Sequence, residues 1–278
     1  MANKPQHLLT LLMALTLSSS GIATAQQIDL RNQSWSAEVI RKTGQPVIPL
    51  YDGWYPNADG SRTMCFSYFN MNTEQALDIQ LGEDNFLSDD RFAALLPTHF
   101  DPLPPRYRHV FCAYTITVPD SFGRDEKIVW SLNSNGQKLS VPGRLNPAYV
   151  LDEPASKGRG DLAPLVRLSA DSDGVRGRTG ISTSSAMAAR VDEPITLSAW
   201  IDHPDNQVWV GWSQHSGPGE VQFDQQESQL TTATGPAVVQ ASFSKPGNYV
   251  VRMQTIDNIA AFEFYCCHTN AYFHINVN

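Results

Sequence analysis

The sequence lacks the local patterns that mark the common enzyme classes. It has no Gly-x-Ser-x-Gly nucleophile elbow, no His-Glu-x-x-His zinc motif and no glycine-rich phosphate loop. Long stretches with helical periodicity are also missing after the N-terminal segment, and 18 glycines and 18 prolines divide the chain into short pieces. The missing motifs leave these enzyme classes without support from the sequence. The division into short pieces favours strands and turns over helices.

Basic residues and long apolar runs are scarce as well. The chain has 20 Lys and Arg against 28 Asp and Glu, a formal net charge of −8. Because an acidic surface repels phosphate, we expect no nucleic acid partner. Beyond the N-terminal segment no stretch is long and apolar enough for a transmembrane segment. An extracytoplasmic protein or a polysaccharide remains as the expected kind of partner.

The N-terminus predicts an export leader. Lys4 supplies a positive charge, residues 8–17 form a short apolar run, and Ala23-Thr24-Ala25 gives the small-x-small pattern of a signal peptidase site. We therefore expect a signal peptide at 1–25 and a mature protein in the periplasm or secreted. The alternative is an uncleaved N-terminal anchor, which the short apolar run and the cleavage site disfavour.

The remaining chain predicts an all-β fold made of two β-sandwich-like domains. Short Val/Ile/Thr/aromatic runs alternate with Gly, Pro, Asn and Asp clusters. Residues 26–152 would form an N-terminal β domain, in which 63–69 is apolar on both faces and so predicts a central strand. Residues 153–190, within a long span without aromatics, would be a linker or covering segment. Residues 191–278 contain seven short strand patterns, as an immunoglobulin-type sandwich does.

The last third of the chain resembles a known family of repeats. Trp-Ser at 212–213 precedes a Ser-Gly-Pro-Gly turn at 216–219, and Pro246-Gly247-Asn248-Tyr249 opens a further strand. These features resemble PKD-type (polycystic kidney disease) or related Ig-like repeats. The resemblance implies a sandwich with the Tyr249 ring in its core and a role as a spacer, adhesion module or carbohydrate-enzyme accessory. The family pattern is interrupted after Asp257 by an insertion.

The four cysteines predict disulfides, because an exported protein folds in an oxidising compartment. The simplest pairing is Cys65–Cys112, which leaves the adjacent Cys266 and Cys267 to form a vicinal bond. The alternative is pairing of Cys266 and Cys267 with Cys65 and Cys112, which would join the two domains.

A metal site is the second interpretation of the Cys266-Cys267-His268 segment. Thiolates and imidazole are ligands for copper or zinc, with His215, His274 or Met253 as remote partners. The alternative is a disulfide beside a surface histidine, in which case we expect no cofactor.

Two further groups of residues are candidates for ligand contacts or chemistry. Trp54 and Tyr55, beside Tyr51, flank a turn and would stack on a sugar ring, unless they form the edge of the core. The acids between 84 and 101 would supply a glycosidase pair, unless they are solvated or capping. The sequence thus favours an exported, non-catalytic binding or scaffold protein. The alternatives are a metal or redox accessory protein and a carbohydrate-active hydrolase.

Overall fold

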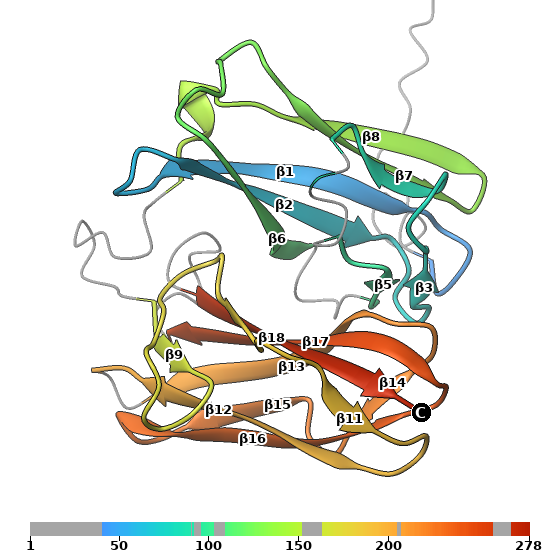
Figure 1. Ribbon diagram of the computed structural model, residues 1–278. Helices are drawn as coiled ribbons and strands as arrows, with labels where there is room; N and C mark the ends of the chain where they lie inside the picture. Colours follow the sequence, from blue (N-terminus) through green and yellow to red (C-terminus); the bar gives the residue numbers. More distant parts are fainter. Residues whose placement is uncertain are drawn as a thin grey trace, which may run out of the picture. The chain divides into compact units, whose positions relative to one another are not determined.

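Strands make up almost all of the regular structure of this protein (Figure 1). The computed structural model describes residues 41–89, 91, 96–102, 109–151, 163–204, 207–257 and 268–278. The expected signal peptide and the Cys266–Cys267 pair lie outside these ranges. Within them, no helix has the length and hydropathy needed to cross a bilayer. The all-β fold class is confirmed, and residues 40–278 form one compact unit.

The N-terminal sandwich packs two three-stranded antiparallel sheets around one core. Phe66 and Tyr114 come from one sheet and Trp130 from the other, with the Tyr114 and Trp130 ring centroids 5.0 Å apart. The first sheet has the order β1 (Val47–Pro56), β2 (Arg62–Asn70), β6 (Val110–Val118), and the second β4 (Asn85–Leu87), β7 (Ile128–Ser134), β8 (Gln137–Gly143). A small sheet of β3 (Leu77–Asp78) and β5 (His99–Phe100) and a turn of 3-10 helix, η3 (Pro147–Tyr149), complete this part.

Turn chemistry and burial explain how this sandwich forms. Asn135 and Gly136 join β7 to β8 with φ angles of 48° and 74°, as a two-residue hairpin of the primed type requires. Pro142 lies in β8, an edge strand, where its missing N–H breaks no ladder. Strand β2 lies between β1 and β6 and is buried on both faces, so the predicted central strand at 63–69 is confirmed.

The C-terminal sandwich is larger and has the immunoglobulin-like arrangement of two facing sheets. One contains β10 (Ile181–Ser182) and β11 (Met187–Ala189), both paired with β18 (His268–Val277), followed by β17 (Gly247–Asp257), β13 (Val208–Ser216) and β15 (Glu227–Leu230). The other has the order β14 (Val221–Phe223), β16 (Thr234–Phe243), β12 (Ile195–Asp202), β9 (Leu165–Arg167). Their inner faces enclose an apolar core that includes Trp212, Phe243 and Phe273.

Tyr249 fixes one corner of this second sandwich. Its ring is buried in the core, and its hydroxyl donates to the Lys245 carbonyl at 2.8 Å. A tyrosine that bonds back to the chain a few residues upstream is a feature of Ig-like sandwiches. Gly217 lies against this ring so closely that a Cβ would come within 2.1 Å of it. The burial of Tyr249 therefore agrees with the expectation from the resemblance to Ig-like repeats.

The segment between the two expected domains contributes strands. Strand β9 pairs with β12, and β10 and β11 add in parallel to β18. Gly180 allows this pairing, because with φ at 72° its Cα lies where a Cβ would meet the Asn270 carbonyl oxygen at 2.2 Å. The described residues of the expected 153–190 linker or cover thus extend both sheets of the C-terminal sandwich.

The outer face of β1-β2-β6 lies against the outer face of β18-β17-β13. Phe111 on β6 meets the His268 ring of β18 with centroids 6.1 Å apart, and the Arg178 guanidinium lies 5.3 Å from the Tyr55 ring centroid. Strand alternation places Arg252 on the outside of β17, yet its side chain is only 4% exposed. The neighbouring sandwich covers this face, so the sheet is buried on both sides.

Candidate functional site

Two bulges shape the face of the N-terminal sandwich that meets the other sandwich. In β1 the register shifts between Tyr51 and Gly53, which leaves Asp52 as an extra residue. In β6 the pairing moves from Phe66–Tyr114 to Tyr68–Val110, and Cys112 has a φ of 42°. Bulges re-aim side chains, and here Cys112 leaves the face of Tyr114 that strict alternation predicts.

The second bulge brings Cys112 to Cys65 on the neighbouring strand. The two form a disulfide whose Cα atoms are 4.8 Å apart, which confirms the predicted Cys65–Cys112 pairing. Both cysteines are fully buried, in a small cluster with Tyr55 and Phe111. The disulfide is therefore buried where the two sandwiches meet, and it links β2 to β6.

Asp52 satisfies the backbone group that the β6 bulge leaves unpaired. Its Oδ2 accepts a hydrogen bond from Cys112 N at 2.8 Å and another from the Ser67 hydroxyl. His109 Nε2 lies 3.6 Å from the other carboxylate oxygen. Burial raises the pKa of Asp52, against the opposing effect of the hydrogen bonds from His109 and Cys112. Because Ser67 donates to the carboxylate and not to an imidazole, these residues form no activated nucleophile.

A buried polar network connects the β6 bulge at Cys112 to the C-terminal sandwich. Arg252 Nη2 donates to the Cys112 carbonyl at 3.2 Å, and its Nε donates to Asn270 Oδ1 at 3.0 Å. Asn270 Nδ2 then donates to the Arg178 carbonyl at 2.6 Å. Buried networks of this kind fix the geometry of the groups they connect when their members are satisfied. Polar contacts as well as apolar packing thus hold the two sandwiches together.

A second set of contacts joins the sandwiches next to β5. Thr98 N donates to the His215 carbonyl at 3.0 Å, and Gly217 N donates to Thr98 Oγ1 at 3.3 Å. The next residue, His99, is held between two carboxylates, with Nδ1 2.7 Å from Asp78 and Nε2 3.0 Å from Asp101. Burial opposes the charged imidazole, but the hydrogen bonds to Asp101 and Asp78 outweigh it and raise the pKa of His99 to about 9.

This arrangement predicts that stability falls as the pH rises from neutral to alkaline. The folded-state pKa of about 9 lies above the ordinary value of 6.5. The stabilisation by the His99 charge is therefore fully present below pH 6.5 and is lost as the pH passes through 9. Between these two pH values we expect the free energy of unfolding to fall by about 2 kcal/mol, measured by urea unfolding.

The matched variant for this prediction is His99→Gln, which keeps a hydrogen-bonding side chain but does not titrate. We expect it to be less stable than the wild type at pH 6.5 and to show a flatter pH profile up to pH 9. Subtracting the two profiles removes the contribution of other titrating groups. Parallel profiles would contradict the role assigned to the His99 charge.

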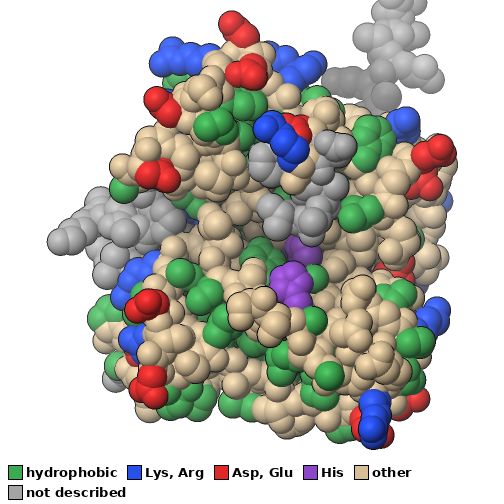
Figure 2. Space-filling view, viewed as in Figure 1, with side chains coloured by type: hydrophobic (Ala, Val, Ile, Leu, Met, Phe, Trp, Pro, Cys, Tyr) green, Lys and Arg blue, Asp and Glu red, His purple; other side chains and the backbone are tan. Residues whose placement is uncertain are grey.

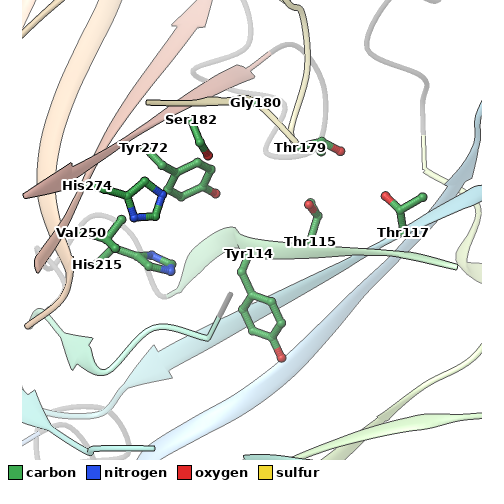
Figure 3. Close-up of a pocket in the computed structure, with 10 residues that line it drawn as sticks. All are labelled: Tyr114, Thr115, Thr117, Thr179, Gly180, Ser182, His215, Val250, Tyr272 and His274. Atoms are coloured by element: carbon green, nitrogen blue, oxygen red, sulfur yellow. The ribbon is translucent and has the colours of Figure 1, made fainter. Parts of the chain in front are cut away.

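A cavity of about 330 Å³ opens at the junction beside these contacts. One wall comes from the outer face of β6 and the other from the C-terminal sandwich (Figure 3). Figure 3 shows the Thr115 and Thr117 side chains on the side of β6 opposite the Tyr114 ring, which points into the N-terminal core. The residues that line the cavity are Tyr114, Thr115, Thr117, Thr179, Gly180, Ser182, His215, Val250, Tyr272 and His274.

The described residues that line the cavity include no Asp, Glu, Lys or Arg. On the face shown in Figure 2, histidine side chains lie near the centre, and acidic and basic side chains lie mainly toward the edges. Inside the cavity, the His215 and Tyr272 rings are in edge contact, with centroids 5.4 Å apart. Burial raises the pKa of Tyr272, so its phenol stays neutral. Sequence reasoning missed this site because its residues come from distant segments.

The residues predicted to stack on a ligand are partly covered. Tyr55 is 3% exposed, Arg178 lies over its ring, and its hydroxyl is 3.2 Å from Thr179 Oγ1. Trp54 is half-buried and donates from Nε1 to the Asn146 carbonyl at 2.8 Å. A sugar would have to displace the guanidinium to stack on Tyr55. Stacking on these two residues stays a prediction.

Of the predicted metal site, only His268 lies within the described residues. It is buried, and its Nε2 has no hydrogen-bond partner there. Burial, together with the positive charges of Arg178 and Arg252, lowers the pKa of His268 well below its ordinary value. Met253 points into the C-terminal core, on the other side of the sheet from His268. No group of three metal-ligating side chains occurs in the described part of the chain. The metal site stays a prediction.

The acids between 84 and 101 have individual partners. Asp84 accepts from Asn133 Nδ2 at 2.7 Å, Asp89 pairs with Arg91, and Asp101 contacts His99. The hydrogen bond from Arg91 lowers the pKa of Asp89. Asp90 lies outside the described residues. A lowered pKa at Asp89 is the opposite of what a glycosidase general acid needs.

Comparison with known proteins adds little. No family model and no curated protein matches the chain. Among solved structures, the D00-D0 domain of intimin is 11% identical, with a TM-score of 0.27, and the match covers 83% of this chain and 99% of that one. PapD-like domain 7 of human CEP192 is also 11% identical, with a TM-score of 0.29, over 46% of this chain and 92% of its own. WR4, a C. elegans MSP family member, is 8% identical, with a TM-score of 0.23, over 32% and 91%. Matches this distant carry no argument about function.

Proposed function

We propose that this chain is an exported, non-catalytic binding or scaffold protein whose recognition surface is the junction of its two sandwiches. The observation that carries the proposal is an open cavity between two modules that a buried network holds together. Walls held in place by a scaffold suit binding, because little freedom is lost when the ligand arrives. The Ser67–Asp52–His109 group, the nearest approach to a catalytic arrangement described above, supports no nucleophile.

The export part of the proposal is supported by the leader pattern at 1–25 and by the Cys65–Cys112 disulfide. Disulfides persist in oxidising compartments such as the periplasm and the cell exterior. We assign the C-terminal sandwich to PKD-type Ig-like modules as part of the same proposal. The Tyr249 corner and its close contact with Gly217 support that assignment.

The test has a catalytic and a binding arm. Incubated with a panel of polysaccharides and esters, the purified protein is expected to give no turnover above the buffer control. In the second arm, isolated cell envelopes are expected to retain the protein on sedimentation. Val250→Trp, which fills the cavity, should abolish retention, because the bulky ring occupies the ligand space.

The control for the binding arm is Val238→Trp, at an exposed valine on β16 in the sheet that faces away from the junction. It should leave retention unchanged. Robust turnover, or equal retention of both tryptophan variants, would contradict the proposed function.

A second candidate function is a metal or redox accessory protein that uses Cys266, Cys267 and His268. One observation favours it: the neutral, buried imidazole of His268 has an Nε2 without a partner among the described residues, and neutral imidazole is the form that binds copper or zinc. Intact mass with disulfide mapping tests it. Two thiols locked in a disulfide, with no bound metal, would remove this candidate.

A further inference from the structure

We infer that the junction cavity binds an uncharged, hydroxyl-rich ligand, namely the end of a neutral oligosaccharide. The inference rests on the proposed function, since it takes the junction as the recognition surface. It adds the chemical class of the ligand, which follows from the charge, the hydroxyls and the ring surfaces of the lining residues.

The described part of the lining offers no permanently charged side chain to a ligand. None of the described residues that line the cavity is Asp, Glu, Lys or Arg. The Arg252 guanidinium, on the same strand as the lining residue Val250, already donates to Cys112 and Asn270. Burying a phosphate, sulfate or carboxylate without a charged partner is costly. The cavity therefore favours a ligand without formal charge.

Hydroxyl groups face the cavity from both sandwiches. Thr115 and Thr117, two residues apart on β6, lie on the same face of that strand, and Thr179 and Ser182 belong to the opposite sandwich (Figure 3). A hydroxyl both donates and accepts hydrogen bonds, as the hydroxyls of a sugar do. The Thr117 hydroxyl already bonds to Thr63, and the Thr179 hydroxyl to Tyr55. A hydrocarbon would cut the hydroxyls of Thr115 and Ser182 off from water, so the lining matches a polyol better.

Ring and aliphatic surfaces complete the lining. Tyr272 and His215 form an edge-contacting pair, and Val250 adds an apolar patch. Apolar walls with a few converging polar groups are typical of small-molecule sites, and the C–H faces of a sugar suit such walls. The cavity volume of about 330 Å³ is near the lower end of ligand pockets, which span about 300–1,000 Å³. We therefore expect it to hold the end of a glycan and not a long chain segment.

The experiment uses the full mature chain on an array of neutral, uronic acid-bearing and sulfated oligosaccharides, followed by calorimetric titration. We expect binding to neutral members only. Thr115→Val and Ser182→Ala each remove one hydroxyl from opposite walls at almost constant shape. Each should weaken binding about three- to tenfold, and the double variant more. The matched control is Thr196→Val, on β12 in the sheet that faces away from the junction, which should bind as the wild type does.

Thermal melting of each variant confirms that it is folded before titration. Binding confined to charged members, or neutral binding that Thr115→Val and Ser182→Ala leave unchanged, would overturn the inference. An array without any binding would overturn it too. If envelope retention still depends on Val250 in that case, the proposed function stands while the ligand class is wrong.

Discussion

Replacing both Cys65 and Cys112 by alanine is expected to lower the free energy of unfolding by about 4 kcal/mol. The bond joins residues 47 positions apart, so it removes much of the freedom of the unfolded chain. It also lies at the β6 bulge, where Asp52 and Arg252 both contact the Cys112 backbone. Urea unfolding of the oxidised wild type and the double variant measures the difference.

The control for this prediction is the double variant Cys266→Ser and Cys267→Ser. A bond between adjacent residues closes a minimal loop, so its loss should cost little stability. If this control loses as much stability as the Cys65 and Cys112 variant, the assignment of the main stabilising disulfide to Cys65–Cys112 is contradicted.

Replacing Arg252 by methionine is expected to cost about 3 kcal/mol, because the change leaves the Cys112 carbonyl and Asn270 Oδ1 buried without their donor. Methionine keeps the apolar stem, so the packing changes little. Because this residue bridges the two sandwiches, we also expect the variant to unfold in two transitions where the wild type unfolds in one. Calorimetry, with tryptophan fluorescence as a second probe, measures both effects.

Arg62→Met is the matched control for Arg252. Arg62 donates to the Asp120 carbonyl and pairs with its carboxylate at 2.8 Å, but the Asp120 side chain is 75% exposed. An exposed pair contributes about 0–1 kcal/mol, so this variant should unfold in one step near the wild-type midpoint. Equal losses for the two arginine variants would contradict the special role of the junction.

Strand pattern and turn chemistry were sufficient to predict much of each sandwich. Apolar residues alternate in 249–255 and 271–277, a strand pattern that predicts inward positions for Tyr249 and Phe273, and both lie in the core. Asn135-Gly136 is a turn signal, and it lies at the β7–β8 hairpin. These features are local, since each depends on residues a few positions apart, and the sequence displays them directly.

The junction was not predictable in the same way. Alternation assigned Arg252 to solvent, because the pattern of one strand does not reveal that a second sandwich covers its outer face. The bulges at Asp52 and Cys112 change the face of the sheet on which a side chain lies, and no short sequence motif predicts them. Strands as short as β10 and β11 form only because they pair with β18. The cavity depends on all of these non-local contacts, so local sequence patterns do not predict it.

The parallel pairing of β10 and β11 has a practical meaning for anyone who isolates the C-terminal module. These two short strands occupy the rim of β18, whose amides and carbonyls would otherwise be open to another chain. A fragment that starts at Val191 lacks these two strands, so we expect the exposed edge of β18 to pair with a strand of another molecule. A fragment that starts before Leu165 keeps it, together with the β9 margin of the opposite sheet.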